Sequence, residues 1–341
     1  MKKHTLLYLV FVGLLMSACK SEVFVYSSFH EPATDGLRFL TSKDGIHWDS
    51  IPGTWLTPAV GKQRVMRDPS IQSTPDGTFH LVWTSSWRGD LGFGYASSKD
   101  LKHWTKEEFI PVMTDTTTVN VWAPELFWDD TRKEMMVIWA SCIPGKFARG
   151  IEDEKNNHRL YYTTTKDFKT FAPAQLLIDP GFSSIDATLV KRGERDYVMV
   201  LKDNTRPERD LKIATARDPR GPWSAAGPAF TEKLTEGPAT VRVKEGWVIY
   251  YDRYGNKDFG AVFTKDFKSF EDWSKKVSIP PLHKHGTIFK AKRIIVDDLI
   301  HNSQFTIDNS QLTIHNHNTP FRGLGGFQFT TPPLGGLGAF N

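Results

Sequence analysis

Thr164-Thr165-Lys166-Asp167, followed by an aromatic residue at Phe171, is one of five related phrases that recur along the chain. The other four begin at Thr41, Ser97, Thr215 and Phe263, and each also ends in an aromatic residue. Their basic residues are separated by 56, 67, 51 and 48 residues, a period that fits one four-stranded sheet per repeat. Each phrase follows an alternating apolar stretch and is typical of a strand that ends in a turn. The repeats therefore predict an all-β fold, a five-bladed β-propeller.

The composition is that of a globular protein with many aromatic rings. The chain has 341 residues, of which 24% are charged and 13% are aromatic, including 11 Trp. This length suits one propeller, since repeat architectures run large as a single domain. The formal net charge is only +4, and no long basic run is present, so the sequence gives no case for binding nucleic acid.

The amino terminus resembles a bacterial lipoprotein signal. Lys2 and Lys3 precede an apolar run, residues 6–16, which is too short for a membrane-spanning helix, and small residues then lead to Cys19. This pattern predicts that residues 1–18 are removed and that Cys19 is lipidated, so that the protein is exported and anchored to a bacterial membrane on the periplasmic side or at the cell surface. The alternative is a plain secretory signal cut nearby, with Cys19 incidental. The only other cysteine is Cys142, so no internal disulfide forms once Cys19 is lipidated.

The two ends of the repeat region complete each other. Residues 23–29 begin a blade that lacks an innermost strand, whereas residues 285–289 supply an innermost strand with no hairpin after it. Pairing of these terminal strands would close the ring and leave no open sheet edge between the first and last blades. We therefore expect a propeller domain over 19–294 and an irregular tail outside it over 295–341. Residues 144–157 form a polar insertion that we expect to border the binding face.

Three carboxylates stand at the starts of predicted innermost strands. Asp68 and Asp186 each precede the basic residue of the following phrase by 31 residues, and Glu236 precedes its own by 29, so we expect matched blade positions. Innermost strands surround the propeller axis, which brings these groups into one central funnel together with His285. Acidic groups gathered around one axis raise at least one pKa, which favours a catalytic site over three separate turn-forming residues.

In order and spacing, the strand-start motifs resemble those of glycoside hydrolase family 43 over about residues 22–290. The motifs that carry this resemblance are Arg67-Asp68-Pro69-Ser70-Ile71, Trp122-Ala123-Pro124-Glu125, Ser184-Ile185-Asp186-Ala187, Glu236-Gly237-Pro238 and His285-Gly286-Thr287. Members of this family are five-bladed propeller hydrolases that act mainly on arabinofuranosides and xylosides. The resemblance implies an inverting glycoside hydrolase that cleaves terminal or branching α-L-arabinofuranosyl linkages of an oligo- or polysaccharide.

The resemblance also implies a role for each acidic residue. Asp68 corresponds to the general base, Glu236 to the general acid, and Asp186 to the group that sets the pKa and orientation of the acid. A nearby Asp186 carboxylate would keep Glu236 protonated, as an inverting mechanism requires. His285 corresponds to an axial histidine, which either lies near a central calcium ion through water or supports the site without metal. No cofactor is required in this interpretation.

Four further residues are candidates for binding the sugar. Trp122 directly precedes an innermost strand and is expected to stack beneath a sugar ring, whereas Arg67, Lys202 and Arg253 are expected to contact hydroxyl groups. Lys202 and Arg253 also fit solvated turn positions. We expect Trp87 to pack against the blades.

Three other functions fit the same motifs. A noncatalytic glycan-binding propeller would keep the funnel, but the presence of all three carboxylates argues against it. A β-galactofuranosidase or β-xylosidase of the same family differs in loops that the sequence does not place. An enzyme that uses phosphate in place of water would gather several Arg and Lys residues around the acid, and Arg67 is the only such residue next to a predicted acid in the motifs.

Overall fold

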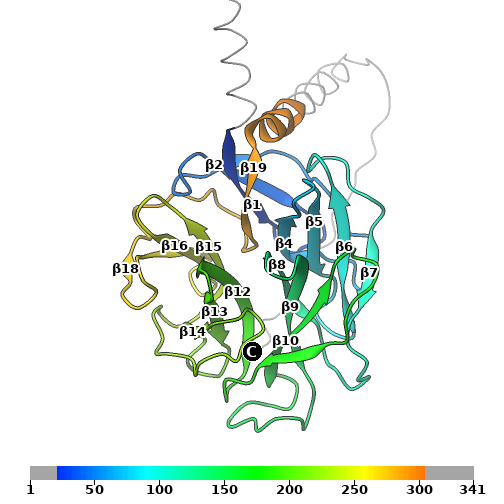
Figure 1. Ribbon diagram of the computed structural model, residues 1–341, viewed down its shortest axis with the longest axis vertical. Helices are drawn as coiled ribbons and strands as arrows, with labels where there is room; N and C mark the ends of the chain where they lie inside the picture. The colour runs from blue at the N-terminus through cyan, green and yellow to red at the C-terminus, as the bar shows by residue number, and fades with distance from the viewer. Residues whose placement is uncertain (1–20, 304–341) are drawn as a thin grey trace, which may run out of the picture. The chain divides into compact units, whose positions relative to one another are not determined.

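The computed structural model describes residues 21–303, which form five antiparallel sheets arranged in a ring around a central axis (Figure 1). The predicted signal segment and Cys19 lie outside the described residues, so export and lipid anchoring remain predictions. From the axis outward, the first sheet consists of β19 (Ile288–Lys292), β1 (Glu22–Ser28), β2 (Arg38–Ser42) and β3 (Asp49–Ile51). The second sheet consists of β4 (Arg67–Ser73), β5 (Phe79–Thr84), β6 (Gly92–Ser98) and β7 (Glu108–Pro111). The third sheet is β8 (Trp122–Asp129), β9 (Glu134–Cys142), β10 (His158–Thr165) and β11 (Gln175–Ile178). The fourth sheet consists of β12 (Ser184–Gly193), β13 (Asp196–Asp203) and β14 (Asp210–Ala216). The fifth consists of β15 (Thr235–Arg242), β16 (Trp247–Arg253), β17 (Asp258–Thr264) and β18 (Glu271–Asp272).

The ring closes as the sequence predicts. β19, from the carboxyl-terminal end of the propeller, pairs antiparallel with β1 from its amino-terminal end, with Tyr26 opposite Ile288 and Glu22 opposite Lys292. This pairing supplies the innermost strand of the first blade, so that β1 is paired on both sides, with β19 and with β2. The five-bladed propeller closed by its two terminal strands is thereby confirmed.

The recurring Lys-Asp phrases are turns held by the aspartate side chain. In four of the five phrases one carboxylate oxygen accepts hydrogen bonds from the two backbone N–H groups two and three residues later, as Asp100 does from Lys102 and His103 at 3.0 and 2.8 Å. Such Asx turns let a short polar side chain replace a backbone acceptor. The chain then returns, so that Trp104 bridges to Ser98. The repeat is thus a structural turn and aromatic cover at the periphery of each blade.

The blade of β12, β13 and β14 departs from the four-strand expectation. Its outer edge is an irregular segment in which the N–H groups of Ser224, Gly227 and Phe230 donate to carbonyls of β14. Pro222 and Pro228 interrupt this segment, and proline has no N–H to complete a ladder. The segment therefore covers the edge of β14 without forming a regular strand.

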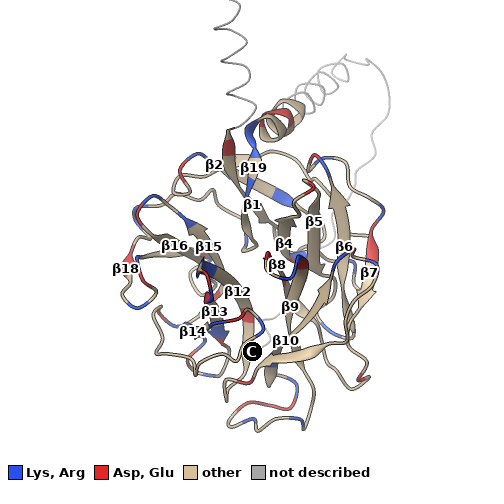
Figure 2. Ribbon diagram, viewed as in Figure 1, with Lys and Arg blue, Asp and Glu red and all other residues tan. Residues whose placement is uncertain are grey.

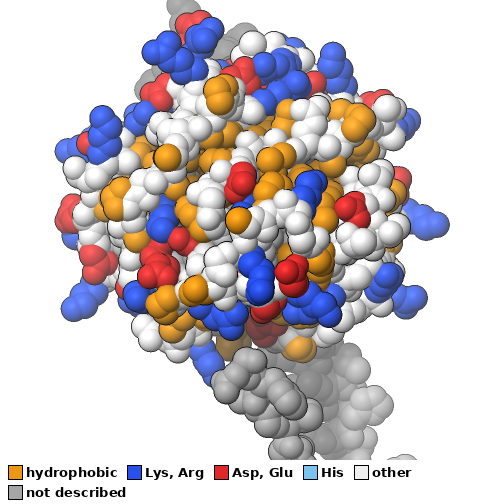
Figure 3. Space-filling view, turned by 90° about the horizontal axis from the view of Figure 1, so that it is seen from below, with side chains coloured by type: hydrophobic (Ala, Val, Ile, Leu, Met, Phe, Trp, Pro, Cys, Tyr) orange, Lys and Arg blue, Asp and Glu red, His pale blue; other side chains and the backbone are white. Residues whose placement is uncertain are grey.

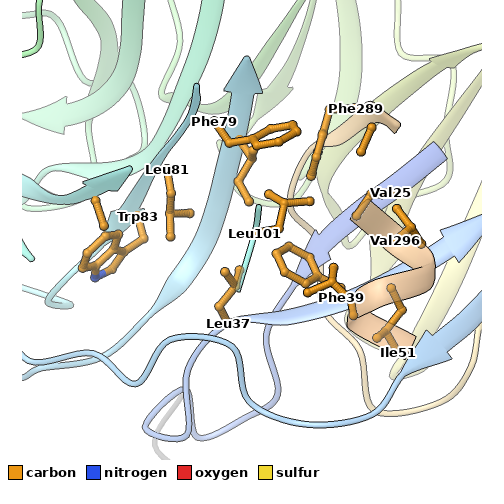
Figure 4. Close-up of a cluster of buried hydrophobic side chains, with 14 of the residues drawn as sticks. Val25, Leu37, Phe39, Ile51, Phe79, Leu81, Trp83, Leu101, Phe289 and Val296 are labelled. Atoms are coloured by element: carbon orange, nitrogen blue, oxygen red, sulfur yellow. The ribbon is translucent and has the colours of Figure 1, made fainter. Parts of the chain in front are cut away.

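Apolar side chains fill the spaces between neighbouring blades. Figure 4 shows one of these clusters, in which Val25 and Phe39 of the first blade lie near Leu81 and Phe79 of the second. A helix over residues 293–303 adds Val296 and Leu299, which are 2% and 0% exposed, to the same cluster. The expected irregular tail is therefore wrong over 295–303, because apolar residues at helical spacing cover the first blade; residues 304–341 lie outside the described part of the chain.

The exterior carries mixed charge. On the side shown in Figure 3, both acidic and basic side chains occur, many of them around the rim, and apolar side chains gather nearer the centre. Within residues 21–303 no helix is both long enough and apolar enough to cross a membrane.

Candidate active site

A β-bulge at the start of the innermost strands aims side chains at the axis. In four blades the pairing with the second strand shifts after Arg67, Trp122, Ile185 and Glu236. The next residue in each blade has a positive φ, namely Asp68 (51°), Ala123 (46°), Asp186 (48°) and Gly237 (59°). Such a φ is unfavourable for residues other than glycine, and it is retained chiefly where the surrounding structure and the function require it.

This register corrects the expected equivalence of the three acids. Asp68 and Asp186 occupy the same bulge position, but Glu236 lies one residue earlier and matches Arg67. Glycine takes the bulge position in the Glu236 blade, and a Cβ atom at Gly237 would overlap the His285 ring. A close approach of backbone to histidine therefore requires glycine there and moves the acid by one position.

The bulges surround a pocket of about 220 Å³ at one end of the axis. Acidic and basic residues both occur on the inner strands around the centre of the ring (Figure 2). The lining residues are Arg67, Asp68, Thr84, Trp87, Trp122, Asn156, Ile185, Asp186, Lys202, Asn204, Arg209, Glu236, Tyr254 and His285. The structure thus brings together all three predicted acids, the predicted histidine and three of the four predicted sugar-binding residues.

Asp68 is held as a carboxylate by partners on both oxygens. Thr84, on the neighbouring strand β5, donates to Oδ2 at 2.7 Å, and Nε2 of His285 lies 2.9 Å from Oδ1. Burial alone would raise the pKa of Asp68, but His285 and Arg67 outweigh it and lower the pKa to about 2. Asp68 is therefore ionised at neutral pH.

The pKa values of Glu236 and Asp186 are shifted in the opposite sense to the sequence-based prediction. Burial favours the neutral form of Glu236, but Lys202, whose Nζ donates to Oε2 at 2.8 Å, and His285 together lower its pKa. Burial raises the pKa of Asp186 to about 6, and the Glu236 charge adds to that rise. Without a bound ligand, the higher pKa lies on Asp186 and Glu236 is paired with an ammonium group. From the sequence we predicted the higher pKa for Glu236, because the sequence does not reveal that Lys202 pairs with it.

His285 lies between two carboxylates. Its Nδ1 is 2.8 Å from Oδ2 of Asp252, and its Nε2 faces Asp68 as described. Burial alone would lower the pKa of His285, but these two carboxylates raise it well above the ordinary value. Glu236, Asp252 and His285 place potential ligand atoms within 4.8 Å of one another. An imidazolium with both nitrogens facing carboxylates has no lone pair for a metal, so His285 fits direct support of Asp68, and a calcium ion held through water remains a prediction.

Glu125 closes the axis beneath the site. Its carboxyl oxygens accept hydrogen bonds from Thr188 at 3.0 Å and Thr287 at 2.7 Å. Burial raises the pKa of Glu125 to about 7, since its partners are hydroxyl groups. These three residues come from three different blades and join the blades at the centre of the propeller.

Aromatic residues and Arg67 form one wall of the pocket. The Arg67 guanidinium is ion-paired with Glu31 and lies over the Trp87 ring, 4.1 Å from its centroid. The Trp122 ring stacks on His158 at 4.8 Å, and its Nε1 donates to the Trp87 carbonyl at 2.8 Å. Trp87 is 48% exposed and lines the pocket, so the expectation that it packs between blades is wrong.

Arg253 is not in the pocket. Its guanidinium pairs with Asp258 across the β16–β17 hairpin, at 2.9 and 2.6 Å. The neighbouring residue, Asp252, has the side chain that points inward and contacts His285. Because adjacent strand residues face opposite sides, placing Asp252 toward the axis turns Arg253 away from it. This corrects its expected role in binding sugar.

Several lining residues carried no signal in the sequence. Thr84, Asn204, Arg209 and Tyr254 lie at the ends of second strands or in the loops after them. The insertion at 144–157 does reach the site as expected, through Asn156, whose Oδ1 accepts a hydrogen bond from Asn204 at 3.2 Å. Glu152, fully buried, anchors the insertion through the backbone N–H of Arg206 at 2.7 Å.

Replacing Lys202 with Met should move the alkaline limb of the pH profile upward. If Glu236 must donate a proton, kcat/KM of the free enzyme falls as the pH rises through the pKa of Glu236. Lys202 lowers that pKa, so Lys202→Met lets Glu236 keep its proton to a higher pH, by about 1 to 3 pH units. The measurement is kcat/KM against pH for both proteins.

The control for this substitution is Lys212→Met. Lys212 donates to Asp203 at 2.6 Å, but neither residue lines the pocket. An alkaline limb that stays in place in Lys202→Met, or one that moves equally in Lys212→Met, would contradict the assigned proton donor.

Comparisons with known proteins show the family of this chain. A family model described as a probable glycosyl hydrolase domain, related to glycoside hydrolase family 43, matches residues 19–294. An α-L-arabinofuranosidase of Bifidobacterium longum is 24% identical over 237 residues, which cover 54% of this chain and 22% of that protein. The chain thus spans less than a quarter of the length of this relative.

Two solved structures share the architecture. An endo-1,4-β-xylanase from Bacteroides thetaiotaomicron has a TM-score of 0.53 and 14% identity, covering 78% of this chain and 93% of that one. A family 43 β-1,3-galactosidase has a TM-score of 0.52 and 14% identity, covering 71% and 54% respectively. At this identity they support the propeller fold.

Proposed function

Since this chain belongs to the family of probable glycosyl hydrolase domains related to glycoside hydrolase family 43, we propose that it is an inverting hydrolase of terminal or branching α-L-arabinofuranosyl linkages. The observation that carries the proposal is one pocket with an ionised Asp68 and, from other blades, the Glu236–Asp186 pair of acids. The arabinofuranosyl specificity is supported by the related arabinofuranosidase.

In the proposed reaction, Asp68 accepts a proton from a water molecule whose oxygen attacks the anomeric carbon. Glu236 gives a proton to the glycosidic oxygen as the bond to the leaving group breaks, so the anomer is inverted. His285 and Thr84 each contact one oxygen of Asp68 and fix the direction of its carboxylate. Glu236 must take up a proton before it can act. Asp186 is the neighbouring acid that is neutral more readily, because burial and the Glu236 charge raise its pKa to about 6.

The pocket volume suits a single sugar ring better than a long chain, which supports action on terminal or branching residues. Trp87 is half-exposed at the pocket wall and offers apolar surface to the sugar, although Arg67 covers one face of its ring. Noncatalytic glycan binding would need neither the ionised Asp68 nor a second acid with a raised pKa in the same pocket, so the enzymatic function is the better supported one.

A panel of aryl α-L-arabinofuranosides, β-D-xylosides and β-D-galactofuranosides tests the proposal. We expect the arabinofuranoside to be cleaved fastest and proton NMR to show the inverted anomer as the first product. A retained anomer would overturn the two-sided mechanism, and cleavage of only the xyloside or galactofuranoside would overturn the specificity.

A further inference from the structure

Arg209 is a cation of the pocket wall that has no anionic partner in the described part of the chain. Its side chain lines the pocket, and its backbone is fixed by two hydrogen bonds, from its own N–H to the Thr205 carbonyl at 3.2 Å and from the Thr235 N–H to its carbonyl at 3.0 Å. Its φ is +48°, which is costly for an arginine. The fold therefore holds this residue firmly at the pocket.

The other basic groups around the pocket are already paired. Lys202 donates to Glu236, Arg67 pairs with Glu31, and the imidazolium of His285 faces two carboxylates. Among residues 21–303, Arg209 forms no ion pair and no side-chain hydrogen bond, and its Nε is buried without a partner. The guanidinium, which lines the pocket, therefore has donors that no protein acceptor in the described part of the chain uses, and a ligand in the pocket can supply that acceptor.

The position of Arg209 indicates which part of a substrate it faces. Its carbonyl accepts from Thr235, the residue directly before Glu236, so Arg209 lies on the side of the proton donor. The proton donor acts on the leaving group, whereas Asp68, on a different blade, acts on the attacking water. A ligand group bound by Arg209 therefore belongs to the leaving-group side.

We propose that Arg209 binds a carboxylate on the leaving-group side of the glycan, so that the preferred substrate carries a uronic acid residue next to the linkage that is cleaved. A guanidinium pairs with a carboxylate through two parallel hydrogen bonds, which gives direction as well as attraction. The inference rests on the proposed function and adds a substrate class to it.

Free phosphate fits the same cation less well. A phosphate that replaced water would attack from the Asp68 side, where the base is ionised and repels an anion. It would also need several unpaired cations, and Arg67 and Lys202 are both engaged by carboxylates. A single unpaired guanidinium beside the proton donor matches one negative charge of a sugar carboxylate.

The test compares two oligosaccharides that differ in one group. In the first, the cleaved sugar is attached to glucuronic acid, and in the second that carboxyl has been reduced to give glucose. Affinity is measured by titration calorimetry and cleavage by kcat/KM, for the wild type, Arg209→Gln and the control Arg195→Gln. Arg195 is an exposed arginine of the β12–β13 hairpin that also has a positive φ, 52°, and does not line the pocket.

We expect the wild type and Arg195→Gln to prefer the acidic oligosaccharide by about 10- to 100-fold, and Arg209→Gln to lose most of that preference. Equal preference in all three proteins, or none in the wild type, overturns the inference. If neither oligosaccharide is cleaved, the proposed function fails, while the calorimetric preference still decides the role of Arg209. Release of a sugar phosphate when inorganic phosphate is added would assign the guanidinium to phosphate and overturn the proposal.

Discussion

Asp68→Asn should lower kcat by about 10²- to 10⁴-fold, the usual contribution of a positioned general base. The amide has nearly the shape of the carboxylate, but it cannot accept a proton from water. The loss should be similar for good and poor leaving groups, because the base acts on the nucleophile. Steady-state kinetics on aryl glycosides with a range of leaving-group pKa values measures it.

A buried acid outside the pocket provides the control for Asp68→Asn. Asp129 is 2% exposed and pairs with Arg132 at 2.7 Å, at the end of β8 far along the strand from the bulge. Asp129→Asn should affect the free energy of unfolding, followed by thermal denaturation, more than kcat. Near-normal kcat in a folded Asp68→Asn variant would rule out Asp68 as the base.

The repeat and its period were sufficient to predict the architecture. Each blade must bury its sheet faces against its neighbours, so the spacing of Lys43, Lys99, Lys166, Arg217 and Lys265 already implies five stacked sheets. Ring closure followed from a missing inner strand at one end and a spare one at the other, which β1 and β19 confirm. These features depend on local pattern and chain order, both of which a sequence displays.

The register at the axis could not be predicted in the same way. Counting residues back from the Lys-Asp turns assigned Glu236 to the same blade position as Asp68 and Asp186. In the structure the bulge position is taken by Gly237, so Glu236 lies one residue earlier than the other two acids. A bulge of this kind depends on the close contact of Gly237 with His285, which lies in a distant part of the sequence. Local spacing has no information about such a contact.

The ion-pair partners of the charged residues could not be predicted from the sequence either. Arg253 and Lys202 both end second strands next to an aspartate, yet Arg253 pairs with Asp258 outside the pocket and Lys202 with Glu236 inside it. The difference comes from which face of the strand each residue occupies once the blade is formed. It also contributes to the pKa of Glu236, because the Lys202 ammonium at 2.8 Å acts together with His285 and Arg67 to outweigh the effect of burial.

Glu236→Gln should show a loss that depends on the leaving group. For glycans and alkyl glycosides, whose leaving groups need a proton, we expect kcat to fall by about 10²- to 10⁴-fold. For a 2,4-dinitrophenyl glycoside, whose leaving group departs as a stable anion, the loss should be small. The amide cannot donate a proton as the acid does, although it keeps nearly the same volume beside Lys202.

The comparison of leaving groups separates the proton donor from the group beside it. Asp186 has the higher pKa without ligand and accepts a hydrogen bond from the Gly237 N–H at 3.1 Å, so it is the competing candidate for the acid. If Asp186→Asn retains activity only on the dinitrophenyl substrate and Glu236→Gln does not, then Asp186 is the proton donor and Glu236 is the neighbouring group. If Glu236→Gln retains activity only on the dinitrophenyl substrate, Glu236 is the proton donor. Its carboxylate must then become protonated, despite its ion pair with Lys202, once substrate fills the pocket. The leaving-group dependence of the two variants therefore decides which carboxyl holds the proton at the moment of bond cleavage.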